Sequence, residues 1–173
     1  SRGVDKTIIQ TLSSCDWIKR KLNILITGPS GAGKSFLASA VAEKACRNGF
    51  SARYYRSHNL LSTLCSAMVD GTFPNCLNQI NKFHVIIIDD WALSKITETE
   101  QKYLFELMEA RNETLSTVFV SQTPVVHWHS LMPNSAIADA IMDRVVHTAL
   151  RIELKGESIR KEITRKAIRS ARH

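Results

Sequence analysis

One short stretch constrains the fold of this chain more than any other, namely residues 23–37 with the sequence NILITGPSGAGKSFL. Within it, the run from Gly28 to Ser35 satisfies the pattern G-x-x-x-x-G-K-[S/T] at every position. The apolar run 24–26 predicts a buried strand before the loop, and apolar residues at helical spacing after Lys34 predict a helix. A glycine-rich turn between a strand and a helix is the setting in which this pattern indicates a phosphate-binding loop (P-loop).

The residue types of this loop suit a nucleoside triphosphate. Glycines let the backbone curl until its N–H groups converge on phosphate oxygens, and the following helix adds the positive end of its dipole. We expect Lys34 to reach the β- and γ-phosphates during catalysis and the Ser35 hydroxyl to ligate Mg²⁺. The residues expected to bind ATP or ADP are Gly28, Pro29, Ser30, Gly31, Ala32, Gly33, Lys34, Ser35 and Phe36.

Composition bounds the class of protein. A length of 173 residues with 44% hydrophobic content fits one domain with a full core. No apolar run approaches the roughly 20 residues of a membrane span, and the four cysteines lack C-x-x-C spacing. These features predict a cytoplasmic protein without a membrane partner, a zinc site or a disulfide framework. The formal charge of +7 favours a polyanionic partner.

The distribution of charge suggests a domain organisation. Between Arg151 and His173 there are eight Lys or Arg against three Asp or Glu. We expect residues 1–155 to form the core domain and 156–173 to form a basic C-terminal helix or tail. The opening residues, SRGVDK, resemble the interior of a longer protein, so we expect a further domain upstream.

A second landmark is the sequence HVIIIDD at residues 84–90. Four apolar β-formers followed by an acid predict a strand buried on both faces of a parallel sheet, with a carboxylate at its tip. This is the Walker B pattern, in which Asp89 would hold the Mg²⁺ shell and Asp90 would orient and deprotonate the attacking water. The alternative is a strand end without a catalytic role.

The rest of the chain alternates between predicted strands and helices. Strands are expected at 52–56, 117–122 and 150–154, the last as a half-exposed edge, and helices at 57–68, 97–112, 135–146 and 157–172, with 72–82 part helix and part loop. A polar side chain at the tip Ser121-Gln122 could touch the γ-phosphate or the lytic water. Trp17 is either a core residue or a cover for an adenine ring.

Six segments carry a more specific resemblance: GPSGAGKSFLASAV, YRSHNLLSTL, IIIDDWALS, TVFVSQTP, IADAIMDRVVH and IELKGESIR. Together they resemble the AAA+ ATPases of the IstB type, which are transposition helpers of insertion sequences and relatives of the DnaC and DnaI helicase loaders. The resemblance spans roughly residues 2–161, and DRVVH followed by KGES is its narrowest part. It implies an α/β three-layer P-loop NTPase with a five-stranded parallel sheet of order 5-1-4-3-2 and a reduced or absent lid.

The resemblance also implies roles for single residues. Gln122 takes the sensor-1 position, and Arg144 takes that of an arginine finger that acts on a neighbouring subunit's nucleotide. The alternative for Arg144 is that it pairs with Asp143 or caps a helix. Family members usually carry Glu at the position of Asp90 and Asn at that of Gln122, and they carry SYR where this chain has residues 158–160. The side chain of Asp90 is thus shorter than usual and that of Gln122 longer. The two changes together either preserve the geometry of the site or slow ATP hydrolysis.

The function that the resemblance implies is an ATP-dependent, DNA-binding regulator in the bacterial cytoplasm, associated with the nucleoid. It would oligomerise on duplex DNA as a ring or spiral and deliver target DNA to a transposase. Candidate DNA contacts are Arg53 and Arg56 after the second strand and Lys95 after the Walker B strand. Two alternatives remain, a helicase loader that engages single-stranded DNA and a monomeric small-molecule kinase, although no insertion for a kinase lid is apparent.

Overall fold

The computed structural model describes residues 6–155. The basic tail predicted for 156–173 lies outside the described residues. Among the helices of the described part, none is both long enough and apolar enough to cross a membrane.

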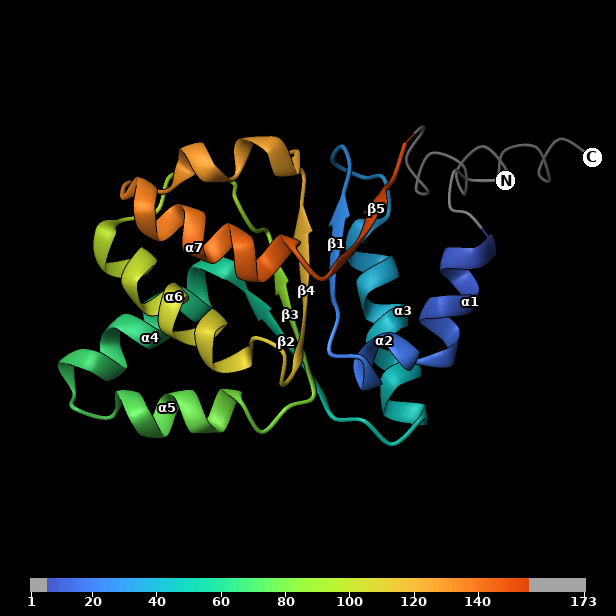
Figure 1. Ribbon diagram of the computed structural model, residues 1–173, viewed down its shortest axis with the longest axis horizontal. Helices are drawn as coiled ribbons and strands as arrows, with labels where there is room; N and C mark the ends of the chain where they lie inside the picture. Colours follow the sequence, from blue (N-terminus) through green and yellow to red (C-terminus); the bar gives the residue numbers. More distant parts are fainter. Residues whose placement is uncertain (1–5, 156–173) are drawn as a thin grey trace, which may run out of the picture.

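Five parallel strands form the sheet at the centre of the molecule (Figure 1). They are β1 (Asn23–Thr27), β2 (Ala52–Arg56), β3 (Val85–Asp89), β4 (Ser116–Ser121) and β5 (Ala149–Glu153). Their order is β2-β3-β4-β1-β5, which confirms the order that the family resemblance implied, counted from the opposite edge strand. The strands β3 and β4 are buried along their whole length, whereas the edge strands β2 and β5 are partly exposed.

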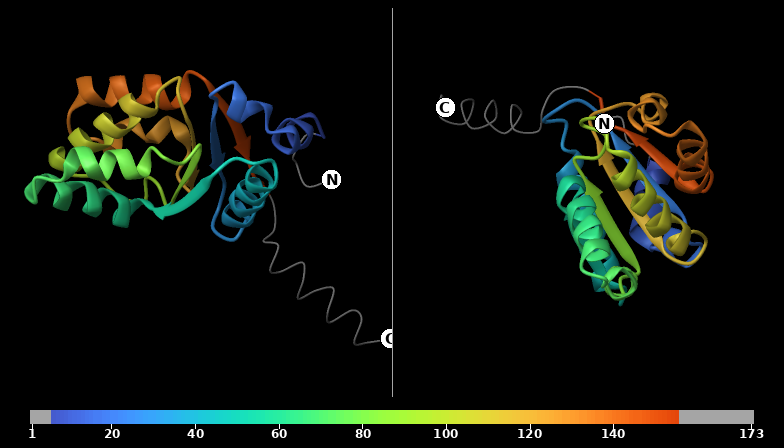
Figure 2. Two further views of the ribbon diagram at one scale, coloured as in Figure 1. Left: turned by 90° about the horizontal axis from the view of Figure 1, so that it is seen from below. Right: turned by 90° about the vertical axis from the view of Figure 1, so that its left-hand side faces the viewer.

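Helices cover both faces of the sheet, so the fold has three layers (Figures 1 and 2). One face carries α1 (Lys6–Ser14), α2 (Asp16–Lys19) and α3 (Lys34–Arg47). The other carries α4 (Ser57–Val69), α5 (Phe73–Ile80), α6 (Glu98–Arg111) and α7 (Ser135–Val146), with two short 3₁₀ turns, Val125–His127 and His129–Leu131, between β4 and α7.

Alternation of side chains along the strands divides the core into two parts. Ile24 and Ile26 belong to the cluster beneath α3, whereas Leu25 between them belongs to the cluster beneath α4, α6 and α7. Trp17 is fully buried in the α3 cluster, so of the two roles considered for it the structure selects the core.

The topology gathers the ends of the strands at one edge of the sheet. In a parallel sheet all carboxyl ends meet at the same edge, where ligands of such folds bind. The register places Thr27 beside Ser121 and Arg56 beside Asp89. The P-loop, the Walker B acids and the polar tip of β4 are therefore neighbours, although they are far apart in the chain.

The predicted helices and strands within the described part are confirmed to within a few residues. Thr97 caps α6 through a reciprocal capping box with Glu100, as expected. One placement was wrong, because Arg53 and Arg56 lie within β2, Arg56 as its last residue, rather than after it. The guanidinium of Arg53 stacks over the rings of Tyr55 and Phe83, at 5.5 and 5.6 Å from their centroids. The strand continues past Arg53 because β2 pairs with β3 throughout its length.

A buried arginine that sequence reasoning missed joins α6 to the amino ends of β3 and β4. Arg111, the last residue of α6, is only 2% exposed. Its guanidinium donates to the carbonyl oxygens of Ser116 (2.7 Å) and Phe83 (3.2 Å) and to the hydroxyl of Thr117 (3.1 Å). Burial lowers the pKa of Arg111 to about 10, so the side chain is still charged at neutral pH.

Candidate active site

The P-loop begins at a position that only glycine can occupy. A Cβ atom on Gly28 would lie 2.5 Å from the carbonyl oxygen of Leu154. The chain approaches this closely because the N–H of Leu154 donates to the carbonyl oxygen of Thr27 at 2.8 Å. At the other end of the loop, Gly33 has a φ of 98° and precedes the first residue of α3. Both features set the loop at the amino end of α3, where backbone N–H groups can meet an anion.

Lys34 points into the loop that precedes it. Its ammonium group donates to the carbonyl oxygen of Pro29 at 2.9 Å. Burial lowers the pKa of Lys34, and the nearby carboxylates of Asp89 and Asp90 act in the opposite direction. The structure therefore places the cation between the P-loop and the Walker B acids, where a phosphate chain would also lie.

Asp89 and Ser35, the two residues expected to share a magnesium ion, are in direct contact. The Ser35 hydroxyl donates to Oδ2 of Asp89 at 3.0 Å, and the N–H of Asp90 donates to Oδ1 of Asp89 at 2.7 Å. Asp89 is 4% exposed at the end of β3. A carboxylate and a hydroxyl are the hard oxygen donors that Mg²⁺ takes together with water and phosphate oxygens, so these residues fit the ion.

Tyr54 is a further residue at this carboxylate that sequence reasoning missed. Its phenol donates a hydrogen bond to the same Oδ2 of Asp89 that Ser35 contacts. Burial and this hydrogen bond raise the pKa of Tyr54 to about 12, so the phenol is protonated at neutral pH and acts as a donor. The only signal in the sequence is its place two residues before the end of a strand predicted to lie in the same sheet.

The loop after β3 has an unusual backbone. Asp90 and Ala92 have φ values of 54° and 61°, in the left-handed region that residues with a Cβ seldom adopt. Each costs about 1–2 kcal/mol relative to a right-handed conformation. The fold must therefore hold this loop in place, and such strain is typical of functional sites.

Two hydroxyl groups at the end of β4 hold the loop. Ser121 donates to the carbonyl oxygen of Trp91 at 2.5 Å, and Thr123 donates to that of Ala92 at 2.7 Å. Gln122, the candidate sensor, lies between these two residues and is exposed. With Gly28 it lines a cavity of about 500 Å³ beside the P-loop. The Walker B loop and the sensor position are thus joined into one unit.

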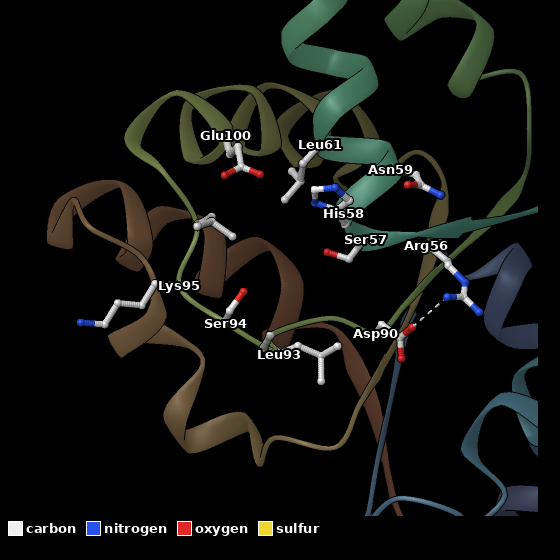
Figure 3. A pocket seen from close by; sticks show the side chains of 12 residues that line it. Arg56, Ser57, His58, Asn59, Leu61, Asp90, Leu93, Ser94, Lys95 and Glu100 are labelled. Atoms are coloured by element: carbon white, nitrogen blue, oxygen red, sulfur yellow. Dashed lines mark ion pairs between the residues drawn. The ribbon is translucent and has the colours of Figure 1, made fainter.

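A second cavity, of about 520 Å³, lies between the start of α4 and the loop after β3 (Figure 3). Arg56 and Lys95 both line it and lie on opposite sides of it. A guanidinium nitrogen of Arg56 is 4.0 Å from Oδ2 of Asp90, and both side chains are substantially exposed. Arg53 is not among the lining residues. Of the three candidate DNA contacts, Arg56 and Lys95 therefore line one cavity beside the Walker B loop, and Arg53 does not.

Arg144 lies near the amino ends of the strands, whereas the P-loop of its own chain lies at their carboxyl ends. The carbonyl oxygen of Arg144 accepts from the side chain of Asn23, at the amino end of β1, whereas Gly28 follows the carboxyl end. Five strand residues at about 3.3 Å each separate the two ends by roughly 16 Å. The guanidinium pairs with Glu109 rather than Asp143, and it stacks over Phe105 at 5.0 Å.

Comparison of the fold with solved structures gives a close likeness to the crystal structure of the DnaC helicase loader. The TM-score is 0.72 at 16% sequence identity, and the match covers 86% of this chain and 89% of that one. At this identity the likeness establishes the fold alone.

Comparison of the sequence is more specific. Two putative insertion sequence ATP-binding proteins of Sinorhizobium fredii, y4pL and y4uH, are each 41% identical to this chain. The matches cover 96% and 92% of this chain but 68% and 64% of the relatives' own lengths. The family model described as IstB-like ATP binding protein matches residues 1–167. With a family model spanning nearly its whole length and relatives at this identity, the chain belongs to the IstB-like ATP-binding proteins.

Proposed function

We propose that this chain is an ATPase that assembles on duplex DNA and helps an insertion sequence to deliver target DNA to its transposase. The observation that carries the proposal is the junction at the tip of β3. There Asp89 contacts Ser35 of the P-loop, and the next residue, Asp90, lies at the cavity lined by Arg56 and Lys95. The groups that would hold and cleave ATP are thus continuous with a basic surface that could hold DNA phosphates.

In this proposal each site residue has a separate role in ATP hydrolysis. Lys34 and the loop N–H groups would hold the phosphate chain, and Ser35 and Asp89 would hold a magnesium ion. A bound ion would supply positive charge that offsets the negative charge of the phosphate oxygens. Asp90 accepts a proton from the attacking water, and Gln122 orients that water from the neighbouring strand end.

Two substitutions separate nucleotide binding from turnover. Lys34→Ala should weaken ATP binding by about 1.5–3 kcal/mol, since it removes a charged hydrogen bond to the phosphates. Asp90→Asn should bind ATP with unchanged affinity but hydrolyse it more slowly, because an amide cannot take the proton. Equilibrium titration with a fluorescent ATP analogue and a phosphate-release assay measure the two effects. Hydrolysis by Asp90→Asn at the wild-type rate would remove Asp90 from the catalytic role.

The DNA surface is tested by removing the two cations of the cavity. The double variant Arg56→Ala, Lys95→Ala should bind duplex DNA more weakly whatever its sequence, because phosphate contacts carry no base information. The slope of log affinity against log salt should become shallower by roughly 0.9 for each DNA phosphate that the protein no longer neutralises. Arg53→Ala is the matched control, since Arg53 carries the same charge on the same strand but lies outside the cavity.

The basic tail offers a competing explanation for DNA binding, and truncation after Lys155 distinguishes the two. Binding through the cavity should require ATP and survive the truncation, whereas binding through the tail should ignore ATP and disappear. If the truncated chain fails to bind while the double variant binds as well as wild type, the cavity is not the DNA surface.

Sedimentation tests the function as a whole. The protein is mixed with duplex or single-stranded DNA, each with ATP, ADP or no nucleotide. Large assemblies on duplex DNA that form only with ATP support the transposition helper. A preference for single strands would instead favour a helicase loader. The fold is also similar to that of the DnaC helicase loader.

A further inference from the structure

Tyr54 is one of three donors that surround the carboxylate of Asp89. Oδ2 of Asp89 accepts two hydroxyl hydrogen bonds, one from Ser35 and one from Tyr54, while Oδ1 accepts the N–H of Asp90. These donors come from three different places in the chain: the start of α3, the edge strand β2 and the loop after β3. Asp89 is 4% exposed, so the protein rather than solvent sets the orientation of its carboxylate.

The sheet register explains why this tyrosine reaches Asp89. Tyr54 pairs with Ile87, two residues before Asp89 on β3, and residues two apart on a strand share a face. Ile87 belongs to the cluster beneath α3, the helix that begins at the P-loop. Tyr54 thus lies on the P-loop side of the sheet. The next residue, Tyr55, packs against the cluster on the other side.

We propose that Tyr54 is a positioning residue for magnesium, which it serves by fixing the carboxylate of Asp89 in the orientation that the ion requires. The inference rests on the proposed function, because the ion would enter with the nucleotide. Without the phenol, the carboxylate keeps Ser35 and the N–H of Asp90 but loses the donor on the side of β2. It could then rotate, and a ligand that must be reoriented binds its metal more weakly.

The size of the effect follows from comparable sites. Loss of a hydrogen bond that orients a metal ligand typically lowers metal affinity about 10- to 100-fold. Tyr54 is 45% exposed and the hydroxyl of Ser35 remains, so we expect the lower part of this range, about tenfold. The effect should appear in magnesium dependence and not in nucleotide binding as such.

The test uses Tyr54→Phe, which removes the hydroxyl and leaves the ring. Binding of a fluorescent ADP analogue is titrated in EDTA and then at rising Mg²⁺ concentrations. The variant should match wild type in EDTA, require about ten times more Mg²⁺ for half-maximal tightening, and recover wild-type turnover at saturating Mg²⁺. Tyr55→Phe is the matched control, because it makes the same chemical change one residue away on the opposite face, and it should behave as wild type in every measurement.

Each other outcome overturns the proposal in a recognisable way. An unchanged Mg²⁺ requirement would show that the phenol does not orient the ligand, and a lower requirement would show that it competes with the ion. Weaker binding by Tyr54→Phe in EDTA as well would place its role in the shape of the pocket. If wild type itself binds no nucleotide, the proposed ATPase fails, and this inference fails with it.

Discussion

Arg144→Ala is expected to lower the rate of ATP hydrolysis by about 10³- to 10⁵-fold while leaving the affinity for ATP unchanged, if Arg144 acts as an arginine finger. The reason to expect action between subunits is geometric. The carbonyl oxygen of Arg144 lies against Asn23 at the amino end of β1, and the P-loop follows the other end of that strand, roughly 16 Å away. We therefore expect the guanidinium to act on the nucleotide of a neighbouring copy rather than on that of its own chain. Turnover and nucleotide binding are measured on the same preparations.

Two controls separate a finger from a structural arginine. Glu109→Gln removes the charge that pairs with Arg144 but leaves the arginine, so its turnover should stay close to wild type. An equal loss in both variants would mean that Arg144 acts through the packing of α6 on α7. Mixing Arg144→Ala with Asp90→Asn should restore some activity, because one type of interface then carries both intact groups. No recovery at any ratio, with both variants still assembling, contradicts action between subunits.

Arg111→Met should lower the free energy of unfolding by about 2–6 kcal/mol. The substitution removes the donor from two carbonyl oxygens, those of Ser116 and Phe83, and each unsatisfied buried acceptor costs about 1–3 kcal/mol. The guanidinium also joins the end of α6 to the amino ends of β3 and β4, so its loss loosens three elements together. Denaturant unfolding followed by circular dichroism measures the change.

The matched control for this prediction is Arg47→Met. Arg47 is likewise the last residue of a 14-residue helix, α3, but it is exposed and pairs with Glu43 one turn earlier. Its replacement should change the unfolding free energy by no more than about 0.5 kcal/mol. Similar losses in both variants would show that the arginine stabilises the helix terminus rather than the junction of helix and sheet.

Local patterns in the sequence were sufficient to predict most of the fold and part of the site. The P-loop and the Walker B run each combine a distinctive composition with a fixed spacing, so these two patterns alone single out Lys34, Ser35 and Asp89 as candidate site residues. Ser35 and Asp89, which are far apart in the chain, are in contact in the structure, as two ligands of one magnesium ion would have to be. The strand order was also expected, but it came from the resemblance to a family and not from the pattern of single strands.

The sequence by itself determined which residues are candidates for binding phosphate and magnesium, since that information lies in consecutive residues. Only the tertiary structure decided which distant groups surround them. Tyr54 reaches Asp89 through the pairing of β2 with β3, and Arg111 finds its carbonyl partners where α6 meets two strand ends. Arg53 and Arg56 differ by three positions in one strand, yet pleating and register put only Arg56 at the cavity. Such contacts depend on register and packing across the sheet, which no local pattern encodes.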